Sequence, residues 1–268
     1  MPSLRSPIDV LVFDSGLGGL SIVRELRRSM PHLRYAYLAD NAGLPYGNKS
    51  DEWLVARVDR VIASVLVRLH PRLIVIACNT ASTLVLETLR AKNPMPIVGV
   101  VPAIKPAATL SQSKIIGLLA TPATVKRPYT ESLIQEFAGG CQVISVGNAR
   151  LVEVAEKKLR GIPPDIAEMK AICLPFIKAP QLDVLVLGCT HFPLLADELQ
   201  TILPRVKLLD SGPAIAQRVQ HVLPLTPEHE SKTSNAPAFF TADAEPDDLR
   251  SVLPLFGFNS LTILPLDS

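Results

Sequence analysis

The stretch Leu73-Ile74-Val75-Ile76-Ala77-Cys78-Asn79-Thr80 decides the fold. Its leading aliphatic residues form a continuous apolar run, which is typical of a strand covered by helices on both faces of a parallel sheet. The small residue, the cysteine and the polar residues that follow predict a turn into a helix. The segment before the stretch, from Trp53 to Leu69, carries apolar residues at helical spacing.

Beyond this stretch, short apolar runs alternate with helical segments along the chain. Such alternation indicates βαβ units and a mostly parallel sheet. We therefore predict an α/β protein whose mostly parallel sheets are flanked by helices. The expected strands are Ile8–Phe13, Arg34–Leu38, Leu73–Ala77, Ile97–Val100, Lys114–Leu119, Gln142–Val146, Asp183–Leu187, Val206–Leu209 and a last one near Leu261–Leu264.

The pattern of the first stretch occurs twice. Val184-Leu185-Val186-Leu187-Gly188-Cys189-Thr190-His191 again runs from aliphatic residues through a small residue to a cysteine and polar residues. A weaker echo links Asp14-Ser15-Gly16 with Asp210-Ser211-Gly212. We therefore expect two pseudo-symmetric lobes. Since ligands in open α/β sheets bind beyond the carboxyl ends of strands, we expect these four segments to converge.

The first expected lobe is discontinuous in sequence. It comprises residues 1–97 plus 207–268, and residues 98–206 form the second lobe as an insertion. Proline-containing stretches at Asn93–Pro96 and Leu203-Pro204 mark the boundaries. The segment Pro224–Pro237, rich in Pro, Glu, Ser and Thr, is interpreted as a surface loop.

The composition excludes several classes of protein. Of the 268 residues, 48% are hydrophobic and 19% are charged. The formal net charge of +2 gives no broad positive potential that would bind nucleic acid. No apolar run approaches the roughly 18 residues of a membrane-spanning helix. Asp9 and Asp14 interrupt the only N-terminal apolar segment, unlike in a signal peptide. Four cysteines do not make a disulfide scaffold, so we expect a soluble cytoplasmic protein with reduced thiols.

Cys78 and Cys189 are the foremost candidates for chemistry. Each is predicted at a helix N-terminus, where the macrodipole and unpaired backbone N–H groups favour a thiolate. The alternative is that both are buried structural thiols, since free cysteine is among the most buried residue types. Their matching contexts favour chemistry, whereas Cys141 and Cys173 lack that context and are interpreted as core or incidental residues.

No metal or other cofactor is expected. Cys189-Thr190-His191 lacks the spacing of zinc ligands. The glycines of Asp14–Gly19 lack the dinucleotide pattern, because Ser21 stands where the last glycine would be. Two interpretations of this stretch stay open: its backbone N–H groups bind a small anion such as a carboxylate, or Asp14 and Ser15 cap a helix.

Three further candidates carry weaker signals. His191 differs from the other histidines because a thiol and a hydroxyl flank it. By turn chemistry alone, Pro45–Ser50 is an ordinary turn. Glu153 lies on a predicted helix and by itself is a solvated surface residue.

Taken in order, these motifs resemble those of the aspartate/glutamate racemase family, and within it the glutamate racemases, over nearly the whole chain. The segment after about Pro224 carries no motif of the family. The stretches that carry the resemblance are Phe13–Ser21, Pro45–Ser50, Ala77–Ser82, Gly99–Pro106, Ile116–Val125 and Leu187–Pro193.

The resemblance implies two α/β lobes related by a pseudo-twofold, with the active site in the cleft between them. It also implies a cofactor-independent isomerase that racemises glutamate and supplies D-glutamate for peptidoglycan. Cys78 would take the proton from D-glutamate, assisted by Asp14. Cys189 would take the proton from L-glutamate, assisted by His191 and Glu153. The residues implied in substrate binding are Asp14, Ser15, Tyr46, Gly47, Asn79, Thr80, Thr121, Thr190 and His191.

Glutamate is the partner that the resemblance implies. Neither nucleic acid nor a membrane is expected, and the sequence leaves a homodimer open. Two other functions stay open as well: a related two-cysteine racemase or isomerase acting on another acid, and a non-catalytic protein that binds a small anion.

Overall fold

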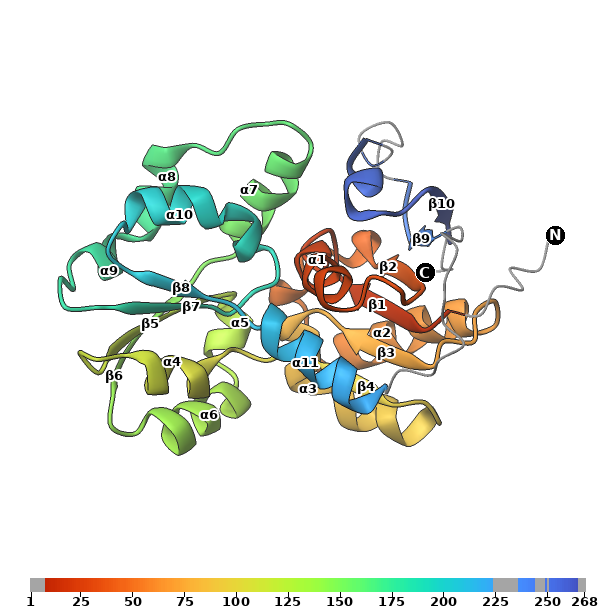
Figure 1. The fold of residues 1–268 in the computed structure, drawn as a ribbon, viewed down its shortest axis with the longest axis horizontal. Helices are drawn as coiled ribbons and strands as arrows, with labels where there is room; N and C mark the ends of the chain where they lie inside the picture. The colour runs from red at the N-terminus through yellow and green to blue at the C-terminus, as the bar shows by residue number, and fades with distance from the viewer. Residues whose placement is uncertain (1–7, 224–235, 244–248, 250, 265–268) are drawn as a thin grey trace. The chain divides into compact units, whose positions relative to one another are not determined.

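The computed structural model describes residues 8–223, 236–243, 249 and 251–264 (Figure 1). The chain divides into two compact units, Met1–Val100 with Gly212–Ser268, and Val101–Ser211. Both boundaries fall a few residues after those expected from the sequence. The reason is strand pairing: β4 (Ile97–Gly99) pairs with β3 (Leu73–Ile76) in the first unit, and β8 (Lys207–Leu209) pairs with β7 (Val184–Leu187) in the second.

The first unit contains a six-stranded sheet in the order β10-β9-β2-β1-β3-β4, with every described pair parallel. Strand β1 at its centre is buried along its whole length. The remaining strands of this sheet are β1 (Val10–Asp14), β2 (Tyr35–Ala39), β9 (Pro237–Phe240) and β10 (Ser260–Ile263).

Helices cover both faces of this sheet. On one face, strand residues such as Leu38 join one apolar core with α2 (Asp51–Leu66) and α3 (Asn79–Lys92). On the other face, the Tyr35 hydroxyl donates to the carbonyls of Leu26 and Met30 at the end of α1. The helices of that second layer are α1 (Leu20–Ser29) and α11 (Gly212–Val222), which pack against each other. Short 3₁₀ turns are η1 (Asn41–Gly43), η2 (Tyr46–Asn48) and η4 (Leu253–Phe256).

The second unit contains a parallel four-stranded sheet in the order β6-β5-β7-β8. Its first strands are β5 (Ile115–Ala120) and β6 (Gln142–Gly147). One face packs on α4 and α6, and the other face meets Phe176 and Leu182 beside Gly117. The helices are α4 (Ile104–Leu110), α5 (Pro122–Val125), α6 (Pro128–Ala138), α7 (Arg150–Leu159), α8 (Ile166–Ile172), α9 (Leu174–Ile177), α10 (Ala196–Ile202) and the 3₁₀ turn η3 (Phe192–Leu195).

The strand orders of the two units match. The order β2-β1-β3-β4 in the first unit recurs as β6-β5-β7-β8 in the second. Strands β3 and β7 are therefore equivalent, which explains the repeated stretches that end in Cys78 and Cys189. The echo between Asp14 and Asp210 has a different origin, because Asp14 ends β1 whereas Asp210 follows β8, the counterpart of β4.

The predicted α/β class with two parallel sheets is confirmed, and each predicted strand coincides with a strand of the structure to within a few residues at its ends. Strand β9 is the strand that the sequence did not reveal. Most of the expected loop at Pro224–Pro237 lies outside the described residues, but Pro237 is buried and begins β9. No helix in the described part of the chain is long and apolar enough to cross a bilayer.

Candidate active site

The thiol of Cys78 lies where the sequence predicts it, at the N-cap of α3 just beyond β3. The residue is 6% exposed, and α3 runs for 14 residues beyond it. The helix dipole and the N–H groups of its first turn favour an anion at this position. The hydroxyl oxygen of Ser15 lies 3.9 Å from the Cys78 sulfur.

Asp14 emerges beside Cys78 from the neighbouring strand. The backbone N–H of Ala77 donates to the carbonyl of Phe13, so the chain segments that lead to the two residues are directly bonded. The buried Asp14 carboxylate accepts a 2.7 Å hydrogen bond from the N–H of Gly19, the N-cap of α1. A Cβ on Gly19 would lie 2.8 Å from the Asp14 Cβ, so this turn requires glycine. Asp14 is not the N-cap of α1, because Gly19 occupies that position without a side-chain cap. The contact of Asp14 with Gly19 therefore fixes the turn before the helix, and the anion-binding interpretation of the turn stays a prediction.

The next candidates of the first unit are Asn79 and Thr80, the first residues of α3, and both are 3% exposed. The side-chain oxygen Oδ1 of Asn79 has no hydrogen-bond partner among the described residues. A buried amide oxygen without a partner is costly. This atom is therefore a place where a bound ligand would supply a donor.

Tyr46 and Gly47 lie in the 3₁₀ turn η2. The Tyr46 ring is buried, and its hydroxyl donates to Oδ2 of Asp40 at 2.7 Å. Burial and the negative charge of Asp40 raise the pKa of Tyr46 well above its usual range, so the phenol stays neutral. The Tyr46 hydroxyl is therefore already bonded, to Asp40.

In the second unit, Cys189 follows β7 after Gly188 and is 7% exposed. A Cβ on Gly188 would lie 2.9 Å from the Leu118 side chain, so this close approach to β5 requires glycine. The predicted helix does not start here. Pro193 has no N–H with which to close an α-helical bond to the Cys189 carbonyl, and the N–H of Phe192 makes a 3₁₀-type bond to it instead.

Unlike Cys78, Cys189 is thus not itself the N-cap of an α-helix, and the polar neighbour of its thiol is the imidazole of His191. Its Nδ1 lies 3.8 Å from the Cys189 sulfur, and its Nε2 lies 2.8 Å from Oε1 of Glu156 on α7. Burial opposes a charge on His191, but the hydrogen bonds to Cys189 and Glu156 outweigh it and raise the pKa of His191 well above its usual range. An imidazolium that persists to higher pH places a positive charge beside the Cys189 sulfur.

The structure brings Glu156 to His191 and does not bring Glu153 there, although the family resemblance implies that Glu153 assists Cys189 together with His191. Glu153 lies on the exposed face of α7, where it forms an ion pair with Arg150. Glu156 is 5% exposed and also lies near Arg160, with 3.4 Å between Oε2 and Nη2. At 3.6 residues per turn, Glu153 lies opposite the buried face of α7 and Glu156 lies at its border. The spacing of the apolar residues in this helix was the signal that could have found it.

Thr121 and Thr190 complete the predicted set. Thr121 is the N-cap of α5 just beyond β5, and its hydroxyl oxygen accepts from the N–H of Thr124 at 3.2 Å. Ala120 and Gly188, the residues that precede Thr121 and Cys189, lie side by side: a Cβ on Gly188 would be 3.0 Å from the Cβ of Ala120. Thr121 and Cys189 therefore follow adjoining strand ends. Thr190 lies between Cys189 and His191 and is buried.

The four cysteines are free thiols. Cys173 is fully buried, and burial raises its pKa to about 11. Cys141 is half-buried. The part of the chain that the structure describes contains no group of three or more His, Cys, Asp and Glu side chains that could hold a metal ion.

Comparison with known proteins shows that the chain is an isomerase of the racemase class. Residues 20–219 match the model of the Asp/Glu/Hydantoin racemase family, and the chain belongs to that family. It is 49% identical over 260 residues to the glutamate racemase of Klebsiella pneumoniae (strain 342), covering 96% of this chain and 92% of that protein.

Solved structures of similar proteins agree with this membership. Escherichia coli glutamate racemase, in complex with L-glutamate and the activator UDP-MurNAc-Ala, matches with a TM-score of 0.91 and 44% identity over 98% of this chain and 100% of that one. Glutamate racemase of Francisella tularensis, in complex with D-glutamate, matches with a TM-score of 0.78 and 26% identity over 97% of this chain and 98% of that one.

Proposed function

We propose that this protein interconverts L- and D-glutamate without a cofactor, through proton transfer between the substrate Cα and the thiols of Cys78 and Cys189. The observation that carries the proposal is the pair of buried thiols at the ends of the equivalent strands β3 and β7. The relatives with L-glutamate and D-glutamate bound support the choice of substrate.

Two thiols suit an inversion at carbon. One thiolate accepts the Cα proton from one face, which leaves a carbanion, and a thiol on the other face delivers a different proton. The two sulfurs have then exchanged protonation states. Cysteine suits this exchange because its pKa can be tuned close to neutral pH, so that thiol and thiolate are both accessible.

Each thiol has its own helper in the proposed mechanism. Cys78 takes the proton from D-glutamate and is assisted by Asp14, which ends the neighbouring strand. Cys189 takes the proton from L-glutamate and is assisted by the His191 imidazolium. Glu156 holds that imidazolium in place, in the role first expected of Glu153.

The carbanion also needs stabilisation, because the Cα proton is a very weak acid. Neutral donors around the substrate α-carboxylate, in a site that excludes water, would lower its energy. The buried oxygen of Asn79 would accept from the substrate ammonium, and the Tyr46–Gly47 backbone would bind a carboxylate. The side chains proposed as donors are Ser15, Asn79, Thr80, Thr121 and Thr190, all of them buried.

We assign the product a role in peptidoglycan synthesis, which consumes D-glutamate. We also place the activity in the cytoplasm, because a mechanism of two free thiols requires a compartment that keeps cysteines reduced. The four free cysteines agree with such a compartment.

Isotope labelling in D₂O tests the proposed mechanism. With L-glutamate as substrate and no added cofactor, we expect D-glutamate to carry deuterium at Cα from the earliest turnover, while the remaining L-glutamate stays mostly protiated. The reason is that the proton removed by one sulfur is not the proton delivered by the other. Circular dichroism follows the racemisation, and mass spectrometry of the separated enantiomers at low conversion measures the label.

Two results would contradict this proposal. Failure to racemise glutamate, together with turnover of another acid in a substrate panel, would overturn the substrate assignment. Substantial protium in the early product, or deuterium in recovered substrate equal to that in product, would overturn the two-thiol mechanism while leaving racemisation intact.

We further propose that a nucleotide-linked cell-wall precursor activates the enzyme, as UDP-MurNAc-Ala is described for the similar Escherichia coli protein. A hollow of about 600 Å³ in the first unit is lined by Arg90, Arg218 and the segment Asn93–Gly99. The Arg90 guanidinium already donates from Nε and Nη2 to the carbonyl of Ile97. The guanidinium of Arg218 matches the chemistry of a diphosphate, since arginine donates to phosphate oxygens in a forked geometry.

A titration with UDP-MurNAc-Ala tests this site. We expect the wild-type rate to rise, and Arg218→Ala to need roughly tenfold more activator, the effect of about 1.4 kcal/mol of lost binding. The basal rate of Arg218→Ala should stay unchanged. A wild-type rate that does not respond, or an Arg218→Ala variant that responds like wild type, would contradict the assignment without affecting the racemase proposal.

A further inference from the structure

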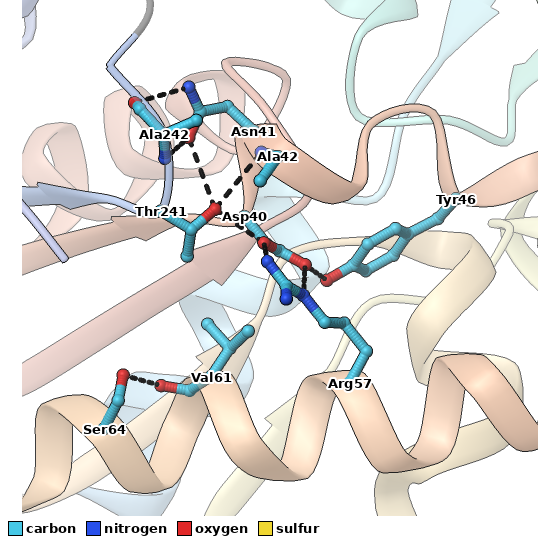
Figure 2. Close-up of polar contacts among 9 residues, drawn as sticks. All are labelled: Asp40, Asn41, Ala42, Tyr46, Arg57, Val61, Ser64, Thr241 and Ala242. Atoms are coloured by element: carbon cyan, nitrogen blue, oxygen red, sulfur yellow. Dashed lines mark hydrogen bonds and ion pairs between the residues drawn. The ribbon is translucent and has the colours of Figure 1, made fainter. Parts of the chain in front are cut away.

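A buried polar cluster joins the residues just beyond β9 to the segment that contains Tyr46. Its centre is the carboxylate of Asp40, which is fully buried. Figure 2 shows three side chains directed at this carboxylate from three different elements: Arg57 from α2, Tyr46 from η2 and Thr241 from just beyond β9.

The contacts of Asp40 use both of its oxygens. Arg57 donates from Nε to Oδ2 at 2.9 Å and from Nη2 to Oδ1 at 2.7 Å, in the forked geometry of strong carboxylate pairs. The Tyr46 hydroxyl donates to Oδ2 at 2.7 Å, and the Thr241 hydroxyl donates to Oδ1 at 2.6 Å. Although burial opposes ionisation, these hydrogen bonds and the charge of Arg57 lower the pKa of Asp40, so the carboxylate is charged.

Thr241 also binds the segment that leads to Tyr46. Its hydroxyl oxygen accepts from the N–H of Ala42 at 3.1 Å. Next to it, the side chain of Asn41 bonds both the N–H and the carbonyl of Ala242. Residues 41–42 are thereby bonded to residues 241–242.

The cluster around Asp40 is tightly packed. A Cβ on Gly43 would lie 2.6 Å from Oδ2 of Asp40 and 2.9 Å from the Tyr46 ring. Trp53 packs edge-on against Tyr46, with 6.2 Å between ring centroids. The backbone from Asp40 to Tyr46 therefore has little freedom to move while the cluster is intact.

We propose that Thr241, Asp40 and Arg57 are positioning residues that hold the Tyr46–Gly47 backbone in place for substrate binding. This inference rests on the proposed function, in which that backbone binds glutamate. It gives Thr241, which directly follows strand β9, a part in the substrate site, although β9 lies beyond residues 20–219, the part that the family model matches.

The test is Thr241→Val, which keeps the shape of the side chain and removes its hydroxyl. We expect KM for glutamate to rise about tenfold, which corresponds to about 1.4 kcal/mol, with kcat changed less than about threefold. Thr241→Ser retains the hydroxyl and should restore the wild-type KM. Trp53, the single tryptophan of the chain, gives a second readout, because its emission should shift in Thr241→Val and not in Thr241→Ser.

Asp9→Asn is the matched control. Asp9 is also a fully buried carboxylate that accepts from arginines, namely Arg34 and Arg72, but it precedes β1 at the opposite end of the sheet. The Asp9→Asn variant should have a lower free energy of unfolding and an unchanged KM for glutamate. If Thr241→Val does not fold, Arg57→Lys replaces it, because lysine keeps the charge but lacks the fork.

The outcomes separate the two proposals. An unchanged KM in Thr241→Val, or in Arg57→Lys where that variant replaces it, overturns the positioning role, as does an equal rise of KM in Asp9→Asn. A wild-type protein that does not racemise glutamate overturns the proposed function instead. In that case the Trp53 emission of the same variants still reports whether the cluster holds the segment.

Discussion

Replacement of either Cys78 or Cys189 by alanine is expected to lower the racemisation rate by at least about 10²–10⁴-fold, the contribution typical of a general acid or base. Each thiol serves one face of Cα, and in the two-base mechanism neither can substitute for the other. Circular dichroism of purified variants, started from L-glutamate and separately from D-glutamate, measures the loss in both directions.

The other two cysteines are the controls for this loss. Cys141→Ala should keep wild-type turnover, because Cys141 is half-buried and takes no part in the proposed mechanism. Cys173→Ala should lower the free energy of unfolding and leave turnover unchanged, because Cys173 is a core thiol whose raised pKa of about 11 keeps it protonated. A folded Cys78→Ala or Cys189→Ala variant with near wild-type turnover would contradict the assignment of the thiols.

Glu156→Gln is expected to lower kcat/KM by roughly 10²-fold, at the lower end of acid–base effects, whereas Glu153→Gln should change it less than about twofold. The two glutamates lie on one helix, but only Glu156 reaches Nε2 of His191, at 2.8 Å. Glu153 forms a surface ion pair with Arg150, and such pairs contribute about 0–1 kcal/mol. Steady-state kinetics of the two variants measure the contrast.

The pH dependence of Glu156→Gln provides a second measurement. The negative charge of Glu156 is one of the causes that raise the pKa of His191, so its removal should lower that pKa. The imidazolium would then be lost at lower pH, and the alkaline limb of the kcat/KM profile should shift in the same direction. An unshifted limb in Glu156→Gln, or equal losses of activity in both glutamate variants, would argue against Glu156 as the residue that holds His191.

Local sequence predicted most of the fold and the positions of both thiols. Buried strands of parallel sheets are continuous apolar runs, so their places and their carboxyl ends are visible without a structure. Strand β9 was not visible, because a four-residue strand that begins with Pro237 carries little local signal. The place of β9 is set by its pairing with β2, which lies far earlier in the chain, and with β10, which follows it.

The sequence by itself determined which residue types stand at the strand ends, because each strand and the turn after it are encoded by neighbouring residues. Only the tertiary structure decided which side chains meet. His191 contacts Glu156 and not Glu153, since the packing of α7 determines which of its faces is buried. Thr241 reaches Asp40 across 201 residues, since β9 lies beside β2. Such contacts depend on how whole elements pack, and no local pattern of residues records that.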